Sequence, residues 1–404
     1  MTVKGNFHIF TSITSNYLAK AFALAASVKK FHPDFKFHAV LSDVLPQDFS
    51  KDINSRLFDS IILADELPIP NYTAWVFKHT LVEMCTAVKG FAFQYIFNKY
   101  QAEEIFYLDP DIVVLAPLDG LIAKFNTASV LLTPHLTVPE DSHQAILDNE
   151  ISSLQHGVFN LGFLGIKSSR MGLEFLNWWT ARLKDYCYDD IPGGLFTDQR
   201  WVDLAPCFFN DLHIVHEPQY NVATWNLSKR KVTGLLERGI SIDDTPVVFY
   251  HFTGFDSGSH EVMLEIYGKH SPVVDELRRW YLRECERLGQ LRYEKIECRY
   301  NNFNNGFKVS RQHRLLYRTR PDLQRIFPDP FRTDDEKKSY YQWYLDNIDC
   351  HAASTDIDRD QRGVDYYRIE LGKTKQELSS IVSSRSWKLF NALLGPYRKI
   401  KKLL

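Results

Sequence analysis

Hydrophobic and polar positions in the first part of the chain follow two alternating periods. Short apolar and β-branched runs predict strands at residues 7–13, 37–41, 60–63 and 105–108. Between them, apolar side chains recur at helical spacing in residues 17–31 and over the long stretch 76–100, which only Gly90 interrupts. Strands that alternate with helices predict an α/β fold, with a mixed, mainly parallel sheet flanked by helices on both faces.

The pattern changes near residue 258. Residues 273–288 predict an amphipathic helix, and residues 314–332 contain many Arg and Pro residues. A length of 404 residues also exceeds that of one average domain. We therefore predict a first domain over residues 1–260 and a mainly helical C-terminal region over residues 261–404.

Composition narrows the class of protein. Apolar residues make up 45% of the chain and aromatic residues 14%, which is enough for a large core. The formal net charge of -2 at pH 7 gives no reason to expect nucleic acid as a partner. The six cysteines are scattered without close pairs, which predicts reduced thiols and a cytoplasmic location. Neither a secretory signal nor an apolar run of about 20 residues is found.

The C-terminal end is locally basic. No acidic residue follows Glu377, and the basic residues of the last stretch are Arg385, Lys388, Arg398, Lys399, Lys401 and Lys402. With the apolar residues among them, residues 386–404 predict a helix at a membrane surface, a contact to a partner enzyme, or a helix that packs on its own chain. The expected protein is cytoplasmic, either soluble or peripheral at the inner face of the membrane.

Polar side chains stand at two predicted strand ends. Ligands of mainly parallel sheets bind outside the carboxyl ends of the strands, where this chain carries Thr11 and Ser12 and, after the strand 105–108, Asp109 and Asp111. Two carboxylates one residue apart offer oxygen ligands suited to Mg²⁺ or Mn²⁺. The alternative is a pair of aspartates that only cap a turn. Two further D-x-D matches, at 356–358 and 358–360, follow no strand, and we predict a solvated loop there.

Residues 106–114, with the sequence FYLDPDIVV, resemble the "YLDxD" strand of GT-A glycosyltransferases. The likeness is strongest to the glycogenin-like retaining group and to bacterial polysaccharide and O-antigen transferases. Further segments resemble that family in its own order, and together they span roughly residues 7–260. They are residues 9–14 with Tyr17, residues 86–89, the "FNxG" segment at 159–163, the "DQ" segment at 197–199 and the "HFxG" segment at 251–254.

The resemblance implies a role for each matched residue. Each also has an ordinary structural explanation, and only their joint occurrence favours the functional one. The implied metal ligands are Asp109, Asp111 and His251, and an imidazole among them favours Mn²⁺ over Mg²⁺. The implied donor-binding residues are Thr11, Ser12, Tyr17, Lys89, Asp109, Gly162 and Gly254. The residues implied to lie beneath the sugar and at its anomeric carbon are Asn160, Asp198 and Gln199.

The sequence departs from the glycogenin-like pattern after its "HFxG" segment. That group continues into Lys-Pro-Trp, whose Lys contacts the donor phosphates, whereas residues 255–258 here are FDSG. A phosphate cation must therefore come from elsewhere, and Lys269 and His270 are the candidates. This departure weakens any inference that the donor or the stereochemistry matches glycogenin.

The expected activity is metal-dependent transfer of a sugar from a nucleoside diphosphate sugar, with a UDP-sugar as the implied donor, to a glycan hydroxyl in bacterial surface polysaccharide synthesis. The acceptor is expected to be lipid-linked, and aromatic residues between Trp201 and Trp225 are candidates to bind it. In the retaining reaction the leaving phosphate takes the acceptor proton, whereas in an inverting reaction Asp198 acts as general base. The alternatives are a nucleotidyltransferase or phosphohydrolase with a similar metal site, and a noncatalytic glycan-binding protein.

Overall fold

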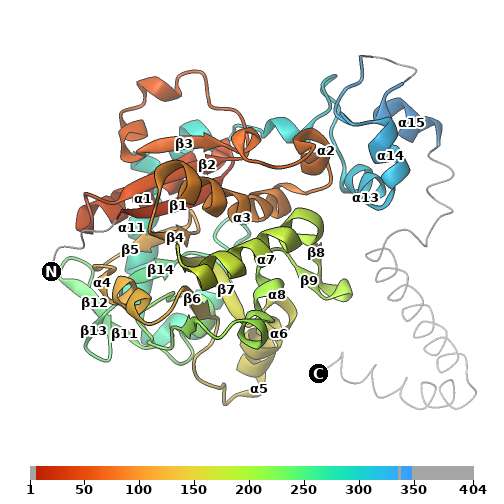
Figure 1. The fold of residues 1–404 in the computed structure, drawn as a ribbon. Helices are drawn as coiled ribbons and strands as arrows, with labels where there is room; N and C mark the ends of the chain where they lie inside the picture. Colours follow the sequence, from red (N-terminus) through yellow and green to blue (C-terminus); the bar gives the residue numbers. More distant parts are fainter. Residues whose placement is uncertain (1–5, 335–337, 348–404) are drawn as a thin grey trace, which may run out of the picture. The chain divides into compact units, whose positions relative to one another are not determined.

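The structure, a computed structural model, describes residues 6–334 and 338–347 (Figure 1). The described residues up to Asp346 form one compact unit. The predictions for the D-x-D matches at 356–360 and for the basic segment 386–404 lie outside the described residues. Within the described part, no helix is both long enough and apolar enough to cross a membrane.

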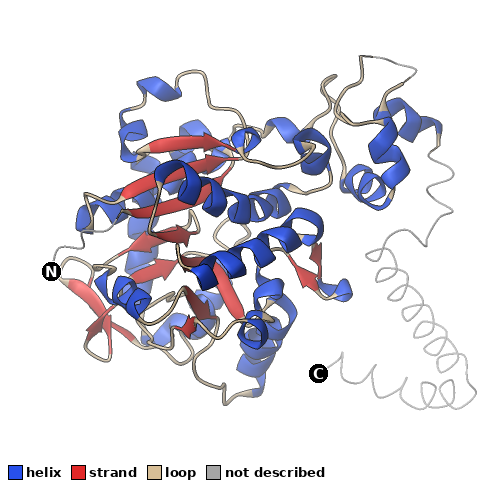
Figure 2. Ribbon diagram, viewed as in Figure 1, coloured by secondary structure: helices blue, strands red, loops and turns tan. Residues whose placement is uncertain are grey.

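A seven-stranded sheet forms the centre of this unit (Figure 2). In spatial order its strands are β10 (Leu212–Ile214), β6 (Val130–Pro134), β7 (Phe159–Lys167), β4 (Glu104–Leu108), β1 (Phe7–Ile13), β2 (Lys36–Leu41) and β3 (Ser60–Leu63). Strand β7 runs antiparallel to β4 and β6, and all other neighbours are parallel. The predicted α/β class with a mixed, mainly parallel sheet is confirmed.

Helices pack on both faces of the sheet and bury its central strands. All seven residues of β1 are buried, as expected for the middle of a mainly parallel sheet. Successive side chains point to opposite faces. Ile9 belongs to the cluster that contains α1 (Leu18–Phe31), whereas Phe10 meets Phe93 of α3 (Leu81–Tyr100) at 4.8 Å between ring centroids.

The stretch 76–100, predicted as one helix, is divided in the structure. It contains the end of α2 (Tyr72–Phe77) and the whole of α3, because Thr80 begins a new helix in a capping box with Glu83. Gly90 does not interrupt α3. A Cβ atom at Gly90 would lie 2.5 Å from Oγ1 of Thr180, so this glycine permits close packing of α3 on α7 (Arg170–Tyr186).

Smaller ladders and short helices fill the rest of the first 260 residues. The ladders are β5 (Ile112–Val114) with β14 (Phe249–His251), β8 (Asp189–Asp190) with β9 (Leu195–Phe196), and β11 (Val232–Leu235) with β12 (Gly239–Ile242) and β13 (Thr245–Pro246). The short helices are α4 (Asp119–Ile122), α5 (His143–Ala145), α6 (Ser152–His156), α8 (Gln199–Val202) and α9 (Ala205–Phe208).

The described residues after residue 260 are mostly helical, as predicted. Its helices are α10 (Ser259–Tyr267), α11 (Pro272–Arg287), α12 (Gln290–Tyr293), α13 (Arg311–Thr319), α14 (Pro321–Ile326) and α15 (Tyr340–Asp346). Tyr281 of α11 stacks on Phe252 with 3.9 Å between ring centroids, and the buried Arg314 of α13 donates to the carbonyl oxygens of Phe77 and His79. A domain boundary at residue 260 stays a prediction. Helices α11 and α12 share a core cluster with the sheet, whereas α13, α14 and α15 form a separate core cluster with α2.

A buried histidine pair crosses the parallel strands β1 to β3. Nδ1 of His8 lies 2.7 Å from Nε2 of His38, and Nδ1 of His38 lies 2.7 Å from the hydroxyl of Ser60. Burial lowers the pKa of His8 to about 4 and that of His38 to about 3. Both imidazoles are therefore neutral at pH 7.

Candidate functional site

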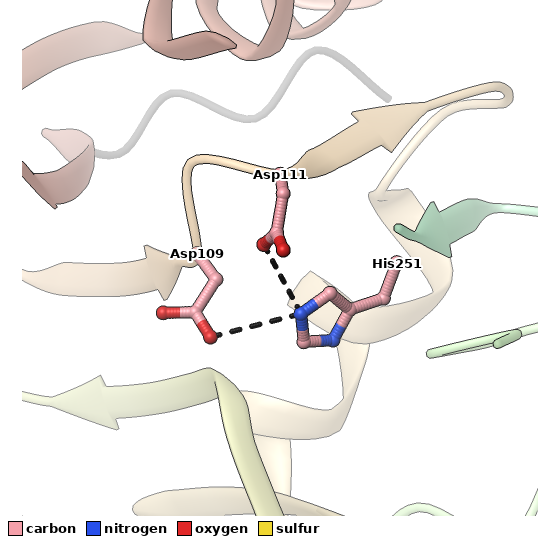
Figure 3. Close-up of side chains that lie close together, drawn as sticks. All are labelled: Asp109, Asp111 and His251. Carbon is pink, nitrogen blue, oxygen red and sulfur yellow. Dashed lines mark ion pairs between the residues drawn. The ribbon is translucent and has the colours of Figure 1, made fainter. Parts of the chain in front are cut away.

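Three candidate metal ligands meet where β4, β5 and β14 end or begin (Figure 3). Asp109 follows β4, Asp111 precedes β5, and the antiparallel pairing of β5 with β14 sets His251 opposite Ile112. The backbone fixes this arrangement, since the amide of Asp109 donates to the carbonyl of Gly162 at 2.8 Å and the amide of Phe252 donates to that of Asp111 at 2.9 Å.

The geometry of the three side chains fits one divalent cation. Nε2 of His251 lies 3.1 Å from Oδ1 of Asp111 and 3.7 Å from Oδ2 of Asp109, and the ligand atoms all lie within 4.8 Å of one another. Neighbouring ligands of an octahedral ion with bonds of about 2.1 Å lie about 3 Å apart. Small side-chain movements therefore suffice to bring all three atoms onto one Mn²⁺ or Mg²⁺.

In this cluster the carboxylates favour the protonated imidazole, and the imidazole favours the ionised carboxyl of Asp111. Burial alone would lower the pKa of His251, but the carboxylates of Asp111 and Asp109 raise it above its usual value. Burial likewise opposes ionisation of Asp111, yet His251 lowers the pKa of that carboxyl. A cation bound here would take the place of the imidazole proton, because only a neutral imidazole can be a ligand.

Asn221 positions the imidazole and was missed in the sequence. Its Oδ1 lies 3.3 Å from Nδ1 of His251, while its amide donates to Oδ1 of Asn160 at 3.0 Å and to Thr133 at 3.1 Å. With a proton on Nδ1, the lone pair of Nε2 faces the carboxylates. Asn221 adopts a left-handed backbone (φ 49°) between elements, and no sequence period marks such a residue.

Lys89 is a buried cation within the site rather than a solvated helix residue. Its Nζ lies 2.9 Å from Oδ2 of Asp198, 3.6 Å from Oδ1 of Asp109 and 4.1 Å from the centre of the Tyr107 ring. Its side chain is only 3% exposed. Burial would lower the pKa of Lys89, but Asp109 and Asp198 raise it, so the ammonium stays charged. The Tyr107 hydroxyl donates to Asp109 as well.

The remaining residues predicted near the sugar are tied to the β7 backbone. Oδ1 of Asn160 accepts a hydrogen bond from the amide of Gly162 at 3.1 Å. Gln199 accepts from the amide of Leu161 at 3.4 Å and donates to the carbonyl of His156 at 2.8 Å. These bonds hold both amide side chains beside the first residues of β7, in the wall of one cavity.

A cavity of about 530 Å³ brings most of the predicted residues together. Small-molecule sites in proteins have volumes of this order. The predicted residues in its wall are Lys89, Asp109, Asn160, Asp198, Gln199, His251 and Gly254. Of the aromatic residues considered for the acceptor, Trp225 also lines the cavity.

Other predicted residues lie outside this wall. Thr11 and Ser12 are buried at the end of β1, and their hydroxyl oxygens have no hydrogen-bond partner among the described residues. Tyr17 contacts Asp256 instead. Lys269 and His270 are exposed in the helical turn Gly268–His270 and are not among the residues that line the cavity. A phosphate role for either of them stays a prediction.

Comparison with known proteins gives distant relatives. No family model matches the chain. Two uncharacterized proteins of Bacillus subtilis strain 168 are similar to it: YfnD is 25% identical over 252 residues, which is 62% of this chain and 78% of YfnD, and YfnF is 24% identical over 251 residues, 61% of this chain and 80% of YfnF.

Solved structures with similar folds are glycosyltransferases. The galactosyltransferase LgtC, solved with donor and acceptor sugar analogs, is 17% identical with a TM-score of 0.40 over 65% of this chain and 95% of LgtC. Mouse xyloside xylosyltransferase 1 is 15% identical, with a TM-score of 0.37 over 61% of this chain and 97% of the xylosyltransferase. The glycosyltransferase GlyE of Streptococcus pneumoniae TIGR4 is 17% identical, with a TM-score of 0.39 over 70% of this chain and 64% of GlyE.

Proposed function

We propose that this chain is a GT-A glycosyltransferase that transfers a sugar from a nucleoside diphosphate sugar, with UDP-sugar as the expected donor, to a glycan hydroxyl. The observation that carries this proposal is that Asp109 and His251 line one cavity together with the buried ion pair of Lys89 and Asp198, while Asp111 completes the metal-ligand cluster beside it. The first group suits a diphosphate-bound cation, and the second lies beside it where the sugar would bind.

Each residue of the site has a physical task in this proposal. A divalent cation held by Asp109, Asp111 and His251 would stabilise the charge that develops on the leaving diphosphate. Asn221 keeps Nε2 of His251 directed at the two carboxylates. Lys89 neutralises Asp198 and also approaches Asp109, so it fixes the spacing between the metal ligands and the sugar-binding side of the cavity.

The contacts of Asp198 support the retaining reaction. Its Oδ2 is paired with Lys89 at 2.9 Å, and its Oδ1 accepts a hydrogen bond from the hydroxyl of Thr197 at 3.1 Å. A carboxylate engaged in this way is better suited to steady charge at the anomeric carbon than to take a proton from the acceptor. NMR analysis of the anomeric configuration of the product tests this, and an inverted linkage would overturn it.

The test of the activity is a screen of nucleotide-sugars with Mn²⁺, Mg²⁺ or a chelator, in which transfer to an acceptor glycan is measured. Metal-dependent transfer is expected, and both Asp109→Ala and Asp111→Ala should abolish it. Pyrophosphate or phosphate release without sugar transfer would instead favour a nucleotidyltransferase or phosphohydrolase. Metal-dependent turnover that survives both substitutions would refute the assigned metal site.

The biological setting is also part of the proposal. A lipid-linked acceptor in bacterial surface polysaccharide synthesis would set the reaction at the cytoplasmic face of a membrane, with residues 386–404 as the contact. Sedimentation with liposomes, comparing the full chain with a chain that ends at residue 385, tests the contact. Equal binding of both forms would remove it.

A further inference from the structure

Lys20 is a buried cation beside the metal-ligand cluster. It lies on α1, which runs along β5, since the amide of Val114 donates to the hydroxyl of Ser27 at 3.0 Å. Lys20 precedes Ser27 by two helical turns on the same face, about 10 Å along the axis. Asp111 precedes Val114 by about the same length of strand. Further along, the amide of Leu118 donates to Nε2 of His32 at 2.8 Å, so α1 and β5 run in the same direction and Lys20 lies toward the Asp111 end of the strand.

The partner of this cation is an exposed carboxylate. Nζ of Lys20 lies 2.6 Å from both oxygens of Asp256, and the hydroxyl of Tyr17 donates to the same carboxylate. The Lys20 side chain is 5% exposed, whereas that of Asp256 is 55% exposed. Gly254 and Gly258, on either side of Asp256, both have positive φ angles, of 70° and 78°. The carboxylate therefore stands on a turn at the surface, while its donors are fixed within the fold.

An ammonium and a phenol hydroxyl that hold a carboxylate form a general oxyanion site. The same donors bind a phosphate oxygen equally well, because charge-assisted hydrogen bonds depend on the charge and spacing of the oxygens. The Lys-Pro-Trp segment, whose Lys contacts the donor phosphates in the glycogenin-like group, is missing from this chain, so the proposed activity needs a phosphate cation from another element. Lys20 is a buried cation on α1, which packs along the strand that follows Asp111.

We propose that Lys20, with the hydroxyl of Tyr17, binds a phosphate group of the donor's diphosphate, and that Asp256 occupies this position until the diphosphate displaces it. The inference rests on the proposed function, because it names the phosphate contact of the same site. Asp256 then acts as an internal competitor. The diphosphate binds only the molecules in which Lys20 is free of Asp256, so its apparent affinity falls in proportion to that fraction of molecules.

The test measures binding of UDP, GDP and ADP with MnCl₂ by isothermal titration calorimetry, and uses the tightest of them for the variants. Lys20→Met should weaken binding of the diphosphate about ten-fold or more, because a charge-assisted bond is lost, and should leave binding of the nucleoside unchanged. Asp256→Asn should strengthen binding of the diphosphate about three-fold or more. Lys29→Met is the matched control: Lys29 lies on α1 too and pairs with Asp59 at 2.7 Å.

The two variants probe the two halves of the inference separately. If the pair only ties the turn to α1, Asp256→Asn will weaken binding or leave it unchanged, and that result would overturn the competitor role even if Lys20→Met does not fold. Unchanged affinity in Lys20→Met would overturn the phosphate contact. If binding is lost in Asp109→Ala but kept in Lys20→Met, only this inference fails. If the wild type binds no nucleoside diphosphate with any metal, the proposed function fails with it.

Discussion

Gly162 offers the sharpest test of the assigned metal site, because it lies under the imidazole. A Cβ atom at this position would lie 2.4 Å from Cε1 of His251, 2.8 Å from its Nδ1 and 2.8 Å from Oδ1 of Asn160. Non-bonded carbon atoms are comfortable at about 3.5–4.0 Å. In Gly162→Ala the imidazole must therefore move by about 1 Å or more.

The consequence for a bound metal should be large. Ligand distances tolerate deviations of only about 0.2 Å, and a displacement of about 1 Å at a reacting centre can lower the rate about 100-fold. His251 cannot move freely, since Asn221 and the Trp225 ring, 5.4 Å away between centroids, contact it from other sides. We expect Mn²⁺ affinity to fall by about 10–100-fold, and overpacking to lower the free energy of unfolding by about 1–3 kcal/mol.

Gly165→Ala is the matched control. Gly165 lies in the same strand, and its added Cβ atom would lie 2.9 Å from Cε1 of Phe106, in the core away from the metal ligands. Mn²⁺ affinity is measured by titration in electron paramagnetic resonance, and stability by urea unfolding. The reasoning is refuted if Gly162→Ala binds Mn²⁺ as tightly as the wild type, or if Gly165→Ala loses as much affinity at equal stability.

Three further predictions follow from buried polar groups. Lys89→Met leaves the buried Asp198 without its cation and should lower the free energy of unfolding by about 3–5 kcal/mol. Lys89→Met with Asp198→Leu should recover most of that loss in urea unfolding, and no recovery would contradict the pairing. Asn221→Gly keeps the left-handed backbone but frees His251, and should lower Mn²⁺ affinity about 10-fold or more; unchanged affinity would remove its positioning role. Because the folded-state pKa values of His8 and His38, about 4 and 3, lie below the ordinary 6.5, the unfolded chain takes up protons first as the pH falls. The contribution of the two histidines to stability is therefore full above about pH 6.5 and is lost toward about pH 4. His38→Gln should make Tm fall less steeply over this pH range, and a Tm that falls as steeply as in the wild type would refute this reasoning.

The parts of the fold that depend on local pattern could be predicted from the sequence. Strands β1, β2, β3 and β4 carry short apolar runs and α1 carries helical spacing, and the burial of both faces of β1 follows from its apolar run, whereas β6, β7 and β10 were not predicted as strands. The break between α2 and α3 was missed because Thr80 and Glu83 stand inside a continuing helical spacing. Capping residues there act locally, and the apolar period alone does not show them.

The candidate site was only partly predictable for a related reason. Its motif residues were found because each follows a short pattern at a strand or helix. Asn221 and Asp256 have no such pattern, and their partners lie far away in sequence: 30 residues separate Asn221 from His251, and 236 separate Lys20 from Asp256. The burial of Lys89 likewise depends on α3 packing over the cavity, which is a property of the assembled fold.

The stacking of Tyr281 on Phe252 limits where this protein can be joined to a relative in a chimera. Phe252 directly follows His251, and its amide is bonded to the carbonyl of Asp111, so the ring of a helix beyond residue 260 rests against the backbone that carries two metal ligands. A chimera joined at residue 260 would supply this ring from a foreign helix. A chimera that exchanges the residues after 260 between relatives should therefore keep α11 and β14 from the same parent. A chimera that separates them should show altered metal affinity although all three metal ligands are unchanged.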